Sequence, residues 1–486
     1  MKKLLLLIIT TFLLSPAFSQ KQRDYLYYIE TFADNLLKHG LDNYGEKKTD
    51  LWAGVIDTRD FSVPKSGVPI TEGVRAYDRA IGGSNIYHDV VTMKVFKILG
   101  ELKNDPKYEN AVKSYIKASL ELTQNPETGL LGWGEHLYYN FYLDKVYTGP
   151  IEPIKVKKHY YDNMPHEFLA WTPPWEEFWE IDSVRTKKAI EGLKYHYQGN
   201  DPRTYLFNRH AYWHKTEHQN IVMPWIKHSV LYSYSYGFLG TKNPEWLYWS
   251  KHCGHLYWKL RDQETNLTLN CLYHPTETDA GKTTSLSNTG YASYWLYKTY
   301  EITGVEEHRA IAIALIEALH KYSWNAEEEY YYASVNLDGS MLPEPTMATP
   351  WKIGYRSSSH IPFGRISAYL GKKENNQSLK DIAEFTATSI SKVPLPENFT
   401  AHNLGDAINL YMDVYDLTGK EEYVKAAKKI GDLAVESLWR NDFFVRENND
   451  HYYEAKLGVG DLLAGLLRIY MVENQVEEYS AIDWSF

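Results

Sequence analysis

The sequence predicts an all-α fold, an (α/α)6–7 barrel or toroid in which helical hairpins surround a central cleft covered by long loops. Two patterns predict it: helical periodicity runs through most of the chain, and one turn motif recurs between pairs of helices. The 486 residues contain no Ser-, Gly- or Pro-rich linker that would separate two folding units. We therefore expect a single domain over residues 20–486.

The helices are predicted from apolar residues that repeat at the period of an α-helix. In 106–123, for example, Tyr108, Ala111, Tyr115 and Leu122 fall near one stripe that a neighbouring helix can cover. Strand-like runs are few and short. The predicted helices span residues 22–39, 86–102, 106–123, 175–196, 244–261, 285–301, 305–322, 377–392, 404–417, 420–438 and 457–472.

The turn motif joins a residue that ends one helix to residues that begin the next. Asn104, Gly304 and Gly419 suit the left-handed end of a helix, and Asn243 precedes a proline that suits the first turn of a new one. The intervals from Asn243 to Gly304 and from Gly304 to Gly419 are close to one and two repeat units of about 60 residues. Such repeats indicate successive helical hairpins, and hence a solenoid or a closed ring. Long loops, which are usually functional in a compact domain, are expected at 45–85, 127–175 and 326–361.

The N-terminus has the pattern of a secretory signal peptide over residues 1–19. Lys2 and Lys3 precede an apolar run from Leu4 to Leu14, and small residues occupy the cleavage positions of Ala17-Phe-Ser19. The run is shorter than the ~20 residues that span a bilayer, and no later stretch is long and apolar enough. We expect an exported protein, periplasmic or secreted, without membrane insertion. Whether Cys253 and Cys271 pair stays open.

Charge and composition narrow the classes of partner. The formal net charge of −10 argues against general binding to nucleic acids, which requires a basic surface. The chain contains 41 tyrosines. Tyrosine offers a flat apolar face with a polar tip, which suits both sugar rings and helix packing.

Polar and aromatic residues gather in one third of the chain and predict a binding or catalytic site there. Histidine titrates near neutrality, arginine pairs with carboxylates, and tryptophan provides stacking platforms. The clusters are Gly132-Trp-Gly-Glu-His136, Pro165-His-Glu-Phe168, Phe207-Asn-Arg-His-Ala211 and Pro224 to His228, which leads into Tyr234.

The predicted helix 285–301 contributes a further candidate. Asn288, Tyr291 and Trp295 share one of its faces. Tyr291 follows His228 by about one hairpin, and equivalent positions of neighbouring inner helices adjoin around the cavity of a ring. Tyr291 is therefore either a packing residue or a group that faces substrate.

No cofactor or metal is predicted. His214 and His218 have the i, i+4 spacing that metals use, but Lys215 stands where a His-Glu-x-x-His motif has its glutamate. The stretch Asp279-Ala-Gly-Lys-Thr283 lacks the first glycine of a phosphate loop, because residue 276 is Thr276.

The order of the motifs resembles exported bacterial polysaccharide lyases with a helical toroid, with polysaccharide lyase family 38 as the nearest named family. These motifs are Gly82-Gly-Ser-Asn-Ile-Tyr-His88 and the four clusters above. The resemblance implies β-elimination at a uronic acid of alginate or glucuronan. It implies that Tyr291 acts as base and acid, with His228, His210, Asn208 and Arg209 around the uronate carboxylate.

The same resemblance implies an anionic polysaccharide as partner. The expected substrate-binding residues are Trp133, His136, His166, Glu167, Tyr234, Asn288, Tyr355 and Arg356. The resemblance also leads us to expect an arginine shortly before Tyr291. The chain has none there, and Arg356 is the substitute candidate for this cation. The acidic chain would then need a locally basic cleft, for which Arg203, Arg209, Lys227 and Arg356 are available.

Three other functions fit the residues. A glycoside hydrolase on the same barrel, acting on uronic-acid oligosaccharides, would need two carboxylates, for which Asp57, Asp60, Glu135 and Glu167 are available. A sugar epimerase would share the histidine-rich cavity, but a signal peptide argues against it. A glycan-binding protein would keep the aromatic residues without catalysis.

Overall fold

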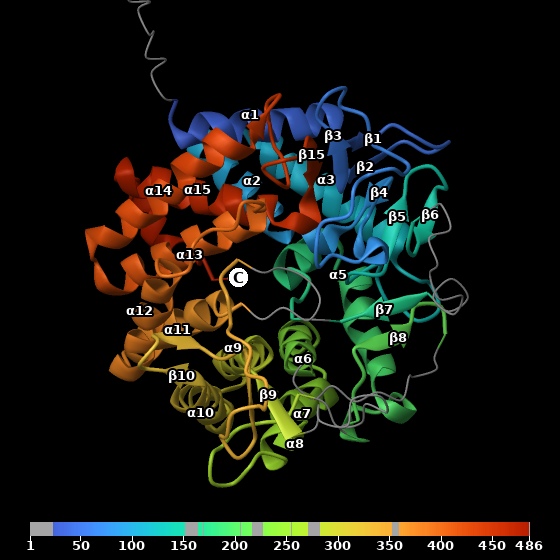
Figure 1. Cartoon of the computed structure of the whole chain (residues 1–486). Coiled ribbons are helices and arrows are strands. Elements are labelled where there is room, and N and C mark those ends of the chain that lie inside the picture. Colours follow the sequence, from blue (N-terminus) through green and yellow to red (C-terminus); the bar gives the residue numbers. More distant parts are fainter. Residues whose placement is uncertain are drawn as a thin grey trace, which may run out of the picture.

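The computed structural model confirms the all-α toroid. It describes residues 23–150, 164–168, 170–204, 206–215, 227–253, 255–270, 282–351 and 359–485. The predicted signal peptide lies outside them. In Figure 1 the helices form a ring around a central axis, with the end of the chain near its middle.

The inner wall consists of helices that contact one another around the ring in the order α2, α15, α13, α11, α9 and α6. Each packs against an outer helix, and α1 packs against α15, so the first helix of the chain pairs with the last. Among the described residues these six pairs make an (α/α)6 ring, and α5 (Trp175–Gly192) lies between α3 and α6. The inner helices are α2 (Val90–Lys103), α6 (Lys227–Thr241), α9 (Leu286–Thr303), α11 (Ile361–Glu374), α13 (Ala401–Thr418) and α15 (Val459–Glu473). Their outer partners are α3 (Pro106–Thr123), α7 (Pro244–His252), α10 (Glu306–Ser323), α12 (Gln377–Ile390), α14 (Glu421–Leu438) and α1 (Tyr25–His39).

The predicted turns all connect an inner helix to its outer partner. Asn104, Gly304 and Gly419 end α2, α9 and α13 with φ of 50°, 67° and 69°, the left-handed conformation that ends a helix. Asn243 caps α7, where its side chain accepts the N–H of Glu245. The sequence analysis missed an equivalent turn at Asn375, which ends α11 with φ of 48°.

The prediction was wrong for two inner helices and for one outer segment. Helices α6 and α11 were missed because they are buried on most sides, so their apolar residues do not form a single stripe. The segment predicted as one helix over 244–261 divides into α7 and the short α8 (His255–Lys259).

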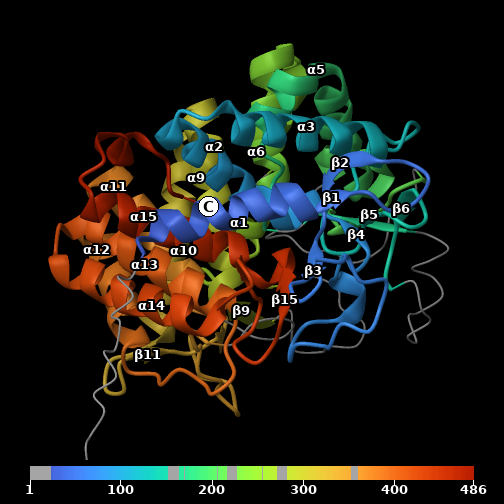
Figure 2. The same ribbon diagram turned by 90° about the horizontal axis from the view of Figure 1, so that it is seen from above.

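Short antiparallel strands occupy parts of the predicted loops, and β4, β9 and β15 lie just before inner helices. The inner helices therefore begin at the end of the ring that carries these strands. The turns to the outer helices lie at the other end. Figure 2 shows β3, β9, β11 and β15 toward one end. The pairs are β1 (Leu41–Asp42) with β2 (Thr49–Trp52), β15 (Tyr452–Glu454) with β3 (Val55–Asp57), β4 (Gly83–Ser84) with β5 (Tyr138–Asn140), β5 with β6 (Lys145–Tyr147), β7 (Pro165–Glu167) with β8 (His210–Tyr212), β9 (Thr283–Ser285) with β12 (Ser334–Asn336), β10 (Trp324–Asn325) with β11 (Tyr330–Tyr331), and β13 (Trp439–Arg440) with β14 (Phe443–Phe444).

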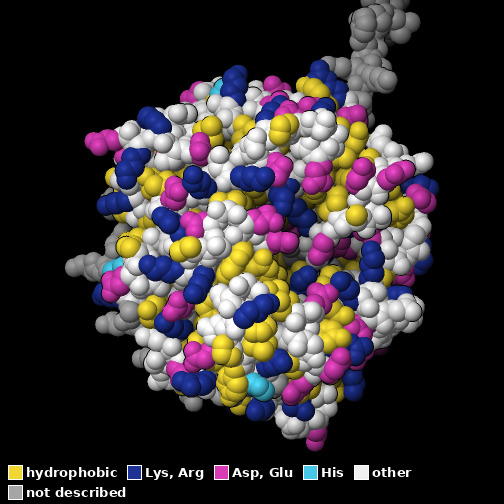
Figure 3. Space-filling view, turned by 180° about the vertical axis from the view of Figure 1, so that it is seen from behind, with side chains coloured by type: hydrophobic (Ala, Val, Ile, Leu, Met, Phe, Trp, Pro, Cys, Tyr) yellow, Lys and Arg dark blue, Asp and Glu magenta, His cyan; other side chains and the backbone are white. Residues whose placement is uncertain are grey.

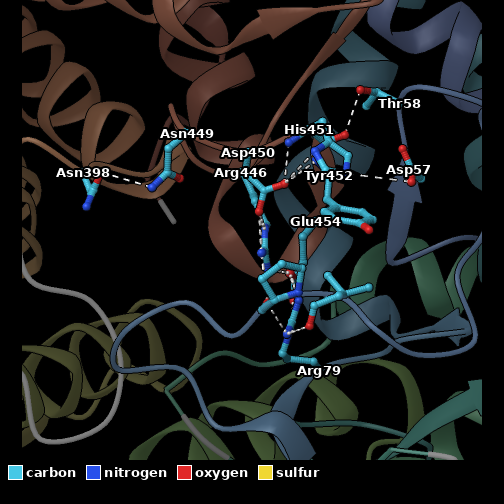
Figure 4. A network of polar contacts seen from close by, with 12 residues as sticks. Asp57, Thr58, Arg79, Asn398, Arg446, Asn449, Asp450, His451, Tyr452 and Glu454 are labelled. Carbon is cyan, nitrogen blue, oxygen red and sulfur yellow. Dashed lines mark hydrogen bonds and ion pairs between the residues drawn. The ribbon is translucent and has the colours of Figure 1, made fainter.

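A buried ion pair network joins the two ends of the chain (Figure 4). The Glu454 carboxylate, 1% exposed, accepts both Nε (2.7 Å) and Nη2 (2.6 Å) of Arg79 and also Nη1 of Arg446 (2.8 Å). Both guanidinium groups also donate to the carbonyl of Pro69 at 2.9 Å. Asp450 completes the network by accepting from Arg446. The network fixes the loop before α2 against the strand before α15.

No described helix combines the length and the apolar content needed to cross a bilayer. Acidic and basic side chains are intermixed on the face seen in Figure 3, so the negative net charge is not gathered into one field there.

Replacing Glu454 should weaken the fold strongly. Glu454→Gln leaves two buried guanidinium groups without their shared carboxylate, and breaking a buried pair in this way costs about 3–5 kcal/mol. Urea unfolding followed by circular dichroism measures the change. As a control, Glu109→Gln removes a half-exposed partner of Lys113 on α3 and should unfold like the wild type. Equal stability of both variants would show that the network does not hold the ring.

Candidate active site

A cavity of about 700 Å³ occupies the middle of the ring. It is the space enclosed by the inner helices, the start of α5 and residues 482–485 near the end of the chain. Aromatic side chains line it alongside charged ones. The aromatic residues are Tyr87, Trp171, Trp175, Tyr232, Tyr291, Tyr294, Trp295 and Trp484.

Two carboxylates and one imidazole meet on the cavity wall where α13 and α15 begin. Nε2 of His402 lies 3.3 Å from Oδ2 of Asp406, and its Nδ1 lies 3.8 Å from Oδ2 of Asp461. All three groups have a ligating atom within 4.8 Å of the others. Gly405 allows this approach, because a Cβ at that position would lie 2.5 Å from the backbone nitrogen of Leu462 on α15.

The charges of this cluster shift one another's protonation. Burial lowers the pKa of His402, but Asp406 and Asp461 outweigh it and raise the value to about 9, so the imidazole is cationic at neutral pH. Burial raises the pKa of Asp406, helped by the charge of Asp461 and opposed by His402. Asp406 thus holds a proton more readily than an ordinary aspartate.

Tyr291 borders the same cavity from α9. Its ring packs edge-on against Trp171, with centroids 5.2 Å apart. Burial and the nearby Asp406 raise the pKa of its hydroxyl, while Arg365 acts in the opposite direction. Tyr291 is therefore a weaker source of phenolate here than free tyrosine.

A second polar cluster lies behind the cavity wall and brings together four predicted residues. Oε1 of Glu167 lies 3.1 Å from Nε2 of His210, 3.5 Å from Nε2 of His136 and 3.5 Å from Nε of Arg209. Burial raises the pKa of Glu167, but His136, Arg209 and His210 outweigh it and hold the value well below the ordinary range. Burial lowers the pKa of His210 to about 4.

Glu135 joins the second cluster to the cavity wall. Glu135 lines the cavity and pairs with Lys456 at 2.6 Å, while its backbone N–H donates to Oε2 of Glu167 at 3.2 Å. Burial raises the pKa of Tyr87 well above 10, and the charges of Glu135 and Glu167 act in the same direction. The predicted Trp133 packs edge-on against Tyr87 at 5.2 Å and is fully buried, so it supports the wall without facing the cavity.

Other predicted residues lie inside the protein, away from the cavity. Nδ1 of His166 contacts Nε2 of His196 at 2.8 Å, and Nδ1 of His196 contacts the carbonyl of Asn208 at 2.8 Å. The Asn208 side chain accepts the backbone N–H of His210 and so orients that strand. Tyr234 is fully buried against Trp246 and Trp249 on α7.

The structure does not place His228 on the cavity with Tyr291. His228 is buried on α6 with its ring 5.3 Å from that of Tyr257. Asn288 lies on α9, where its amide is 3.4 Å from Oδ1 of Asn270. Tyr355 and Arg356 lie outside the described residues.

Of the four carboxylates available for the hydrolase alternative, Glu135 lines the cavity and Glu167 belongs to the cluster behind its wall. Asp57 pairs with Arg59 and Asp60 caps an exposed turn, so neither lines the cavity. Asp406 and Asp461 were missed, although each follows a glycine near the start of an inner helix. The Gly-Asp pair that recurs near the start of both helices is the sequence pattern that could have indicated these two aspartates.

The expected basic cleft has a different composition. Arg203 pairs with Asp201 on the surface, and Lys227 is fully buried on α6. The cations that line the cavity are Lys94, Lys97, Lys298, Arg365 and Lys456.

No family model matches the chain. Similar solved structures include a D-mannose isomerase, with 11% identity, a TM-score of 0.49 and coverage of 94% of this chain and 99% of that one. A cellobiose 2-epimerase from Bacillus thermoamylovorans has 11% identity and a TM-score of 0.48, covering 93% and 98%. A glycoside hydrolase family 76 α-mannanase from Bacteroides thetaiotaomicron has 10% identity and a TM-score of 0.49, covering 94% and 98%. At these values the similarities carry no argument about the reaction, and the resemblance to polysaccharide lyase family 38 stays a prediction.

The charge of His402 should depend on Asp461. Asp461→Asn removes a negative charge that stabilises the imidazolium, so the pKa of His402 should fall from about 9 toward its ordinary value near 6.5. Titration of the imidazole carbon-bound protons by NMR measures this. Asp338→Asn, in an exposed loop, should leave the value unchanged. A pKa of His402 that is insensitive to Asp461→Asn would contradict the described cluster.

Proposed function

We propose that this protein is a glycoside hydrolase whose active site is the central cavity, with Asp406 and Asp461 as the two catalytic carboxylates. The observation that carries the proposal is their pairing beside a cationic His402 in a cavity lined by aromatic residues. Hydrolysis of a glycosidic bond needs one carboxyl group that holds a proton and one that does not.

The environment of the pair assigns the two roles. Asp406, whose pKa is raised, protonates the oxygen of the leaving sugar. Asp461 then acts as the carboxylate that attacks the anomeric carbon, and water later displaces it with Asp406 as base. An oxygen of each carboxylate lies within 4.8 Å of one on the other. With Asp461 as the nucleophile the reaction passes through a covalent glycosyl-enzyme, so we propose retention of configuration.

The aromatic part of the lining supports a carbohydrate substrate, and two cations beside the carboxylate pair offer a position for one negatively charged group. Trp171, Trp295 and Trp484 offer flat faces for sugar rings. Arg365 and the imidazolium of His402 add positive charge near the carboxylate pair, which favours a uronic-acid oligosaccharide. Together with the predicted signal peptide, this supports an exported enzyme of polysaccharide degradation.

A lyase remains the second candidate because Tyr291 borders the same cavity near Arg365. In β-elimination the tyrosine would remove the C5 proton of a uronate and pass it to the leaving oxygen. A phenolate needs cationic neighbours, whereas Asp406 raises the pKa of Tyr291. This charge environment is the reason that we favour hydrolysis.

One set of variants separates the two reactions. Asp406→Asn and Asp461→Asn should each lower hydrolysis by at least about 10³-fold, because each removes a carboxyl group required at the transition state. Tyr291→Phe should retain most of the activity. The measurement is the release of reducing ends, and in parallel of ultraviolet-absorbing unsaturated uronate, from alginate, glucuronan, pectate and glycosaminoglycan fragments.

Asp338→Asn serves as the control for a carboxylate outside the cavity. Unsaturated product that appears with the wild type and vanishes in Tyr291→Phe would establish elimination and refute hydrolysis. Turnover by both aspartate variants at the wild-type rate would refute the assignment of the carboxylate pair.

The pH profile should respond to His402 in a defined direction. Activity requires the protonated acid, so kcat/KM should fall as pH rises through the pKa of Asp406. The His402 imidazolium lowers that pKa. His402→Gln should therefore move the alkaline limb to higher pH, even where it lowers the maximum rate. A limb that stays in place, or moves to lower pH, would exclude Asp406 as the acid.

A further inference from the structure

We infer that His136, Glu167 and His210 form a binding site for one divalent cation of the zinc class, behind the cavity wall and separate from the proposed catalytic carboxylates. The site offers two imidazole nitrogens and one carboxylate oxygen, a donor set that zinc prefers. It does not depend on the reaction proposed above.

The backbone presents the three side chains to one point. Glu167 and His210 are paired directly across β7 and β8, so their side chains emerge on the same face of this two-stranded sheet. Gly134 brings the segment before His136 against β7. Its φ is +86°, and a Cβ there would lie 2.4 Å from the carbonyl oxygen of Glu167. Only glycine therefore permits this close approach.

The two spacings to the carboxylate oxygen fit a tetrahedral ion, and the third pair of donor atoms lies within 4.8 Å. Bonds of about 2.0–2.1 Å in a tetrahedron place neighbouring ligand atoms about 3.3 Å apart. Oε1 of Glu167 lies 3.1 Å from Nε2 of His210 and 3.5 Å from Nε2 of His136, on either side of that value. Three protein ligands leave a fourth position for water or another donor.

Groups around the three ligands hold them in place. Nδ1 of His136 lies 3.1 Å from Oδ1 of Asp78, so a carboxylate lies behind the ring of this ligand, as it does behind many metal-binding histidines. Arg75 in turn pairs with the other oxygen of Asp78 at 2.6 Å. Oε2, the other carboxylate oxygen of Glu167, accepts the backbone N–H of Glu135. Nε2 of His136 and Oε1 of Glu167, which lie 3.5 Å apart, are the atoms that would bind the proposed ion.

Burial distinguishes this cluster from the one at His402. The side chains of His136 and Glu167 are fully buried and that of His210 is 9% exposed, whereas His402 is 38% exposed and contributes the only imidazole of its cluster. Arg209 is the competing cation, because its Nε lies 3.5 Å from the same oxygen of Glu167. A metal would share that carboxylate with Arg209.

The proposed ion would join three separate segments behind the cavity. His136 belongs to the loop that carries Glu135 and its pair with Lys456 on the cavity wall, Glu167 belongs to β7, and His210 belongs to β8. Binding would therefore position Glu135 without contact between the ion and substrate.

Metal analysis of the full-length protein tests the site. Protein stripped with a chelator and dialysed against ZnCl2 should retain about one zinc per chain, and its thermal midpoint should rise relative to the stripped form. His210→Ala and Glu167→Gln should lose this zinc. Asp78→Asn should lower the affinity by about 10–100-fold, and His402→Ala should keep the wild-type stoichiometry. Co²⁺ in place of zinc should give the visible absorption of a tetrahedral site in the wild type.

Arg209→Gln distinguishes a metal site from a plain ion pair cluster. Removal of the competing cation should raise the affinity for zinc, whereas a cluster held only by charge pairs would be destabilised and gain no metal. Less than about a tenth of a zinc per chain in the wild type, together with an absent cobalt spectrum, would overturn the inference. Full zinc content in His210→Ala would do the same. If Glu167→Gln fails to fold, the cobalt spectrum and His210→Ala still decide.

Discussion

The ring depends on one buried carboxylate. Glu454, on the strand before α15, lies between two guanidinium groups, one from the loop before α2 and one from the segment between β14 and β15, and it is buried from solvent. Charges buried in this way stabilise only while all partners remain, because each unpaired ion carries a large desolvation cost. The pairing of β15 with β3 and of α15 with α1 closes the ring at the same place. Just beyond Glu454, Lys456 and Asp461 reach the cavity, so this closure also positions the proposed active site.

Close helix packing brings the polar groups of the cavity together. Gly405 lets α13 approach the backbone of α15 at Leu462, and this contact places Asp406 beside Asp461. Two carboxylates at such a distance would repel each other strongly in a dry interior. The imidazolium of His402 offsets the repulsion, and the two carboxylates in turn raise its pKa. The pKa of Asp406 still rises, because burial and the charge of Asp461 outweigh the effect of His402. The packing of small residues thus produces the electrostatics on which acid–base chemistry depends.

Sequence patterns predicted the fold well because its turns are local. A left-handed Asn or Gly at the end of an inner helix, as at Asn104 or Gly419, depends only on nearby residues. Helices α6 and α11 escaped detection because a helix buried all round lacks an amphipathic stripe. The site was harder to predict, since Asp406 and Asp461 lie far apart in the sequence and adjoin only through the crossing of α13 and α15. The tyrosine excess proved ambiguous for the same reason: Tyr108 is buried between helices, whereas Tyr291 reaches the cavity.

The two reactions proposed for the cavity make opposite demands on its charge. Elimination needs Tyr291 as a phenolate, so carboxylates beside it oppose the reaction by raising its pKa. Hydrolysis needs a carboxyl group that retains its proton, and burial next to a second carboxylate favours that state in Asp406. The same pair of aspartates therefore promotes one chemistry and suppresses the other. A uronate bound next to Arg365 would add a further negative charge, which raises the pKa of Asp406 and strengthens it as an acid, while it makes the tyrosine a still poorer base.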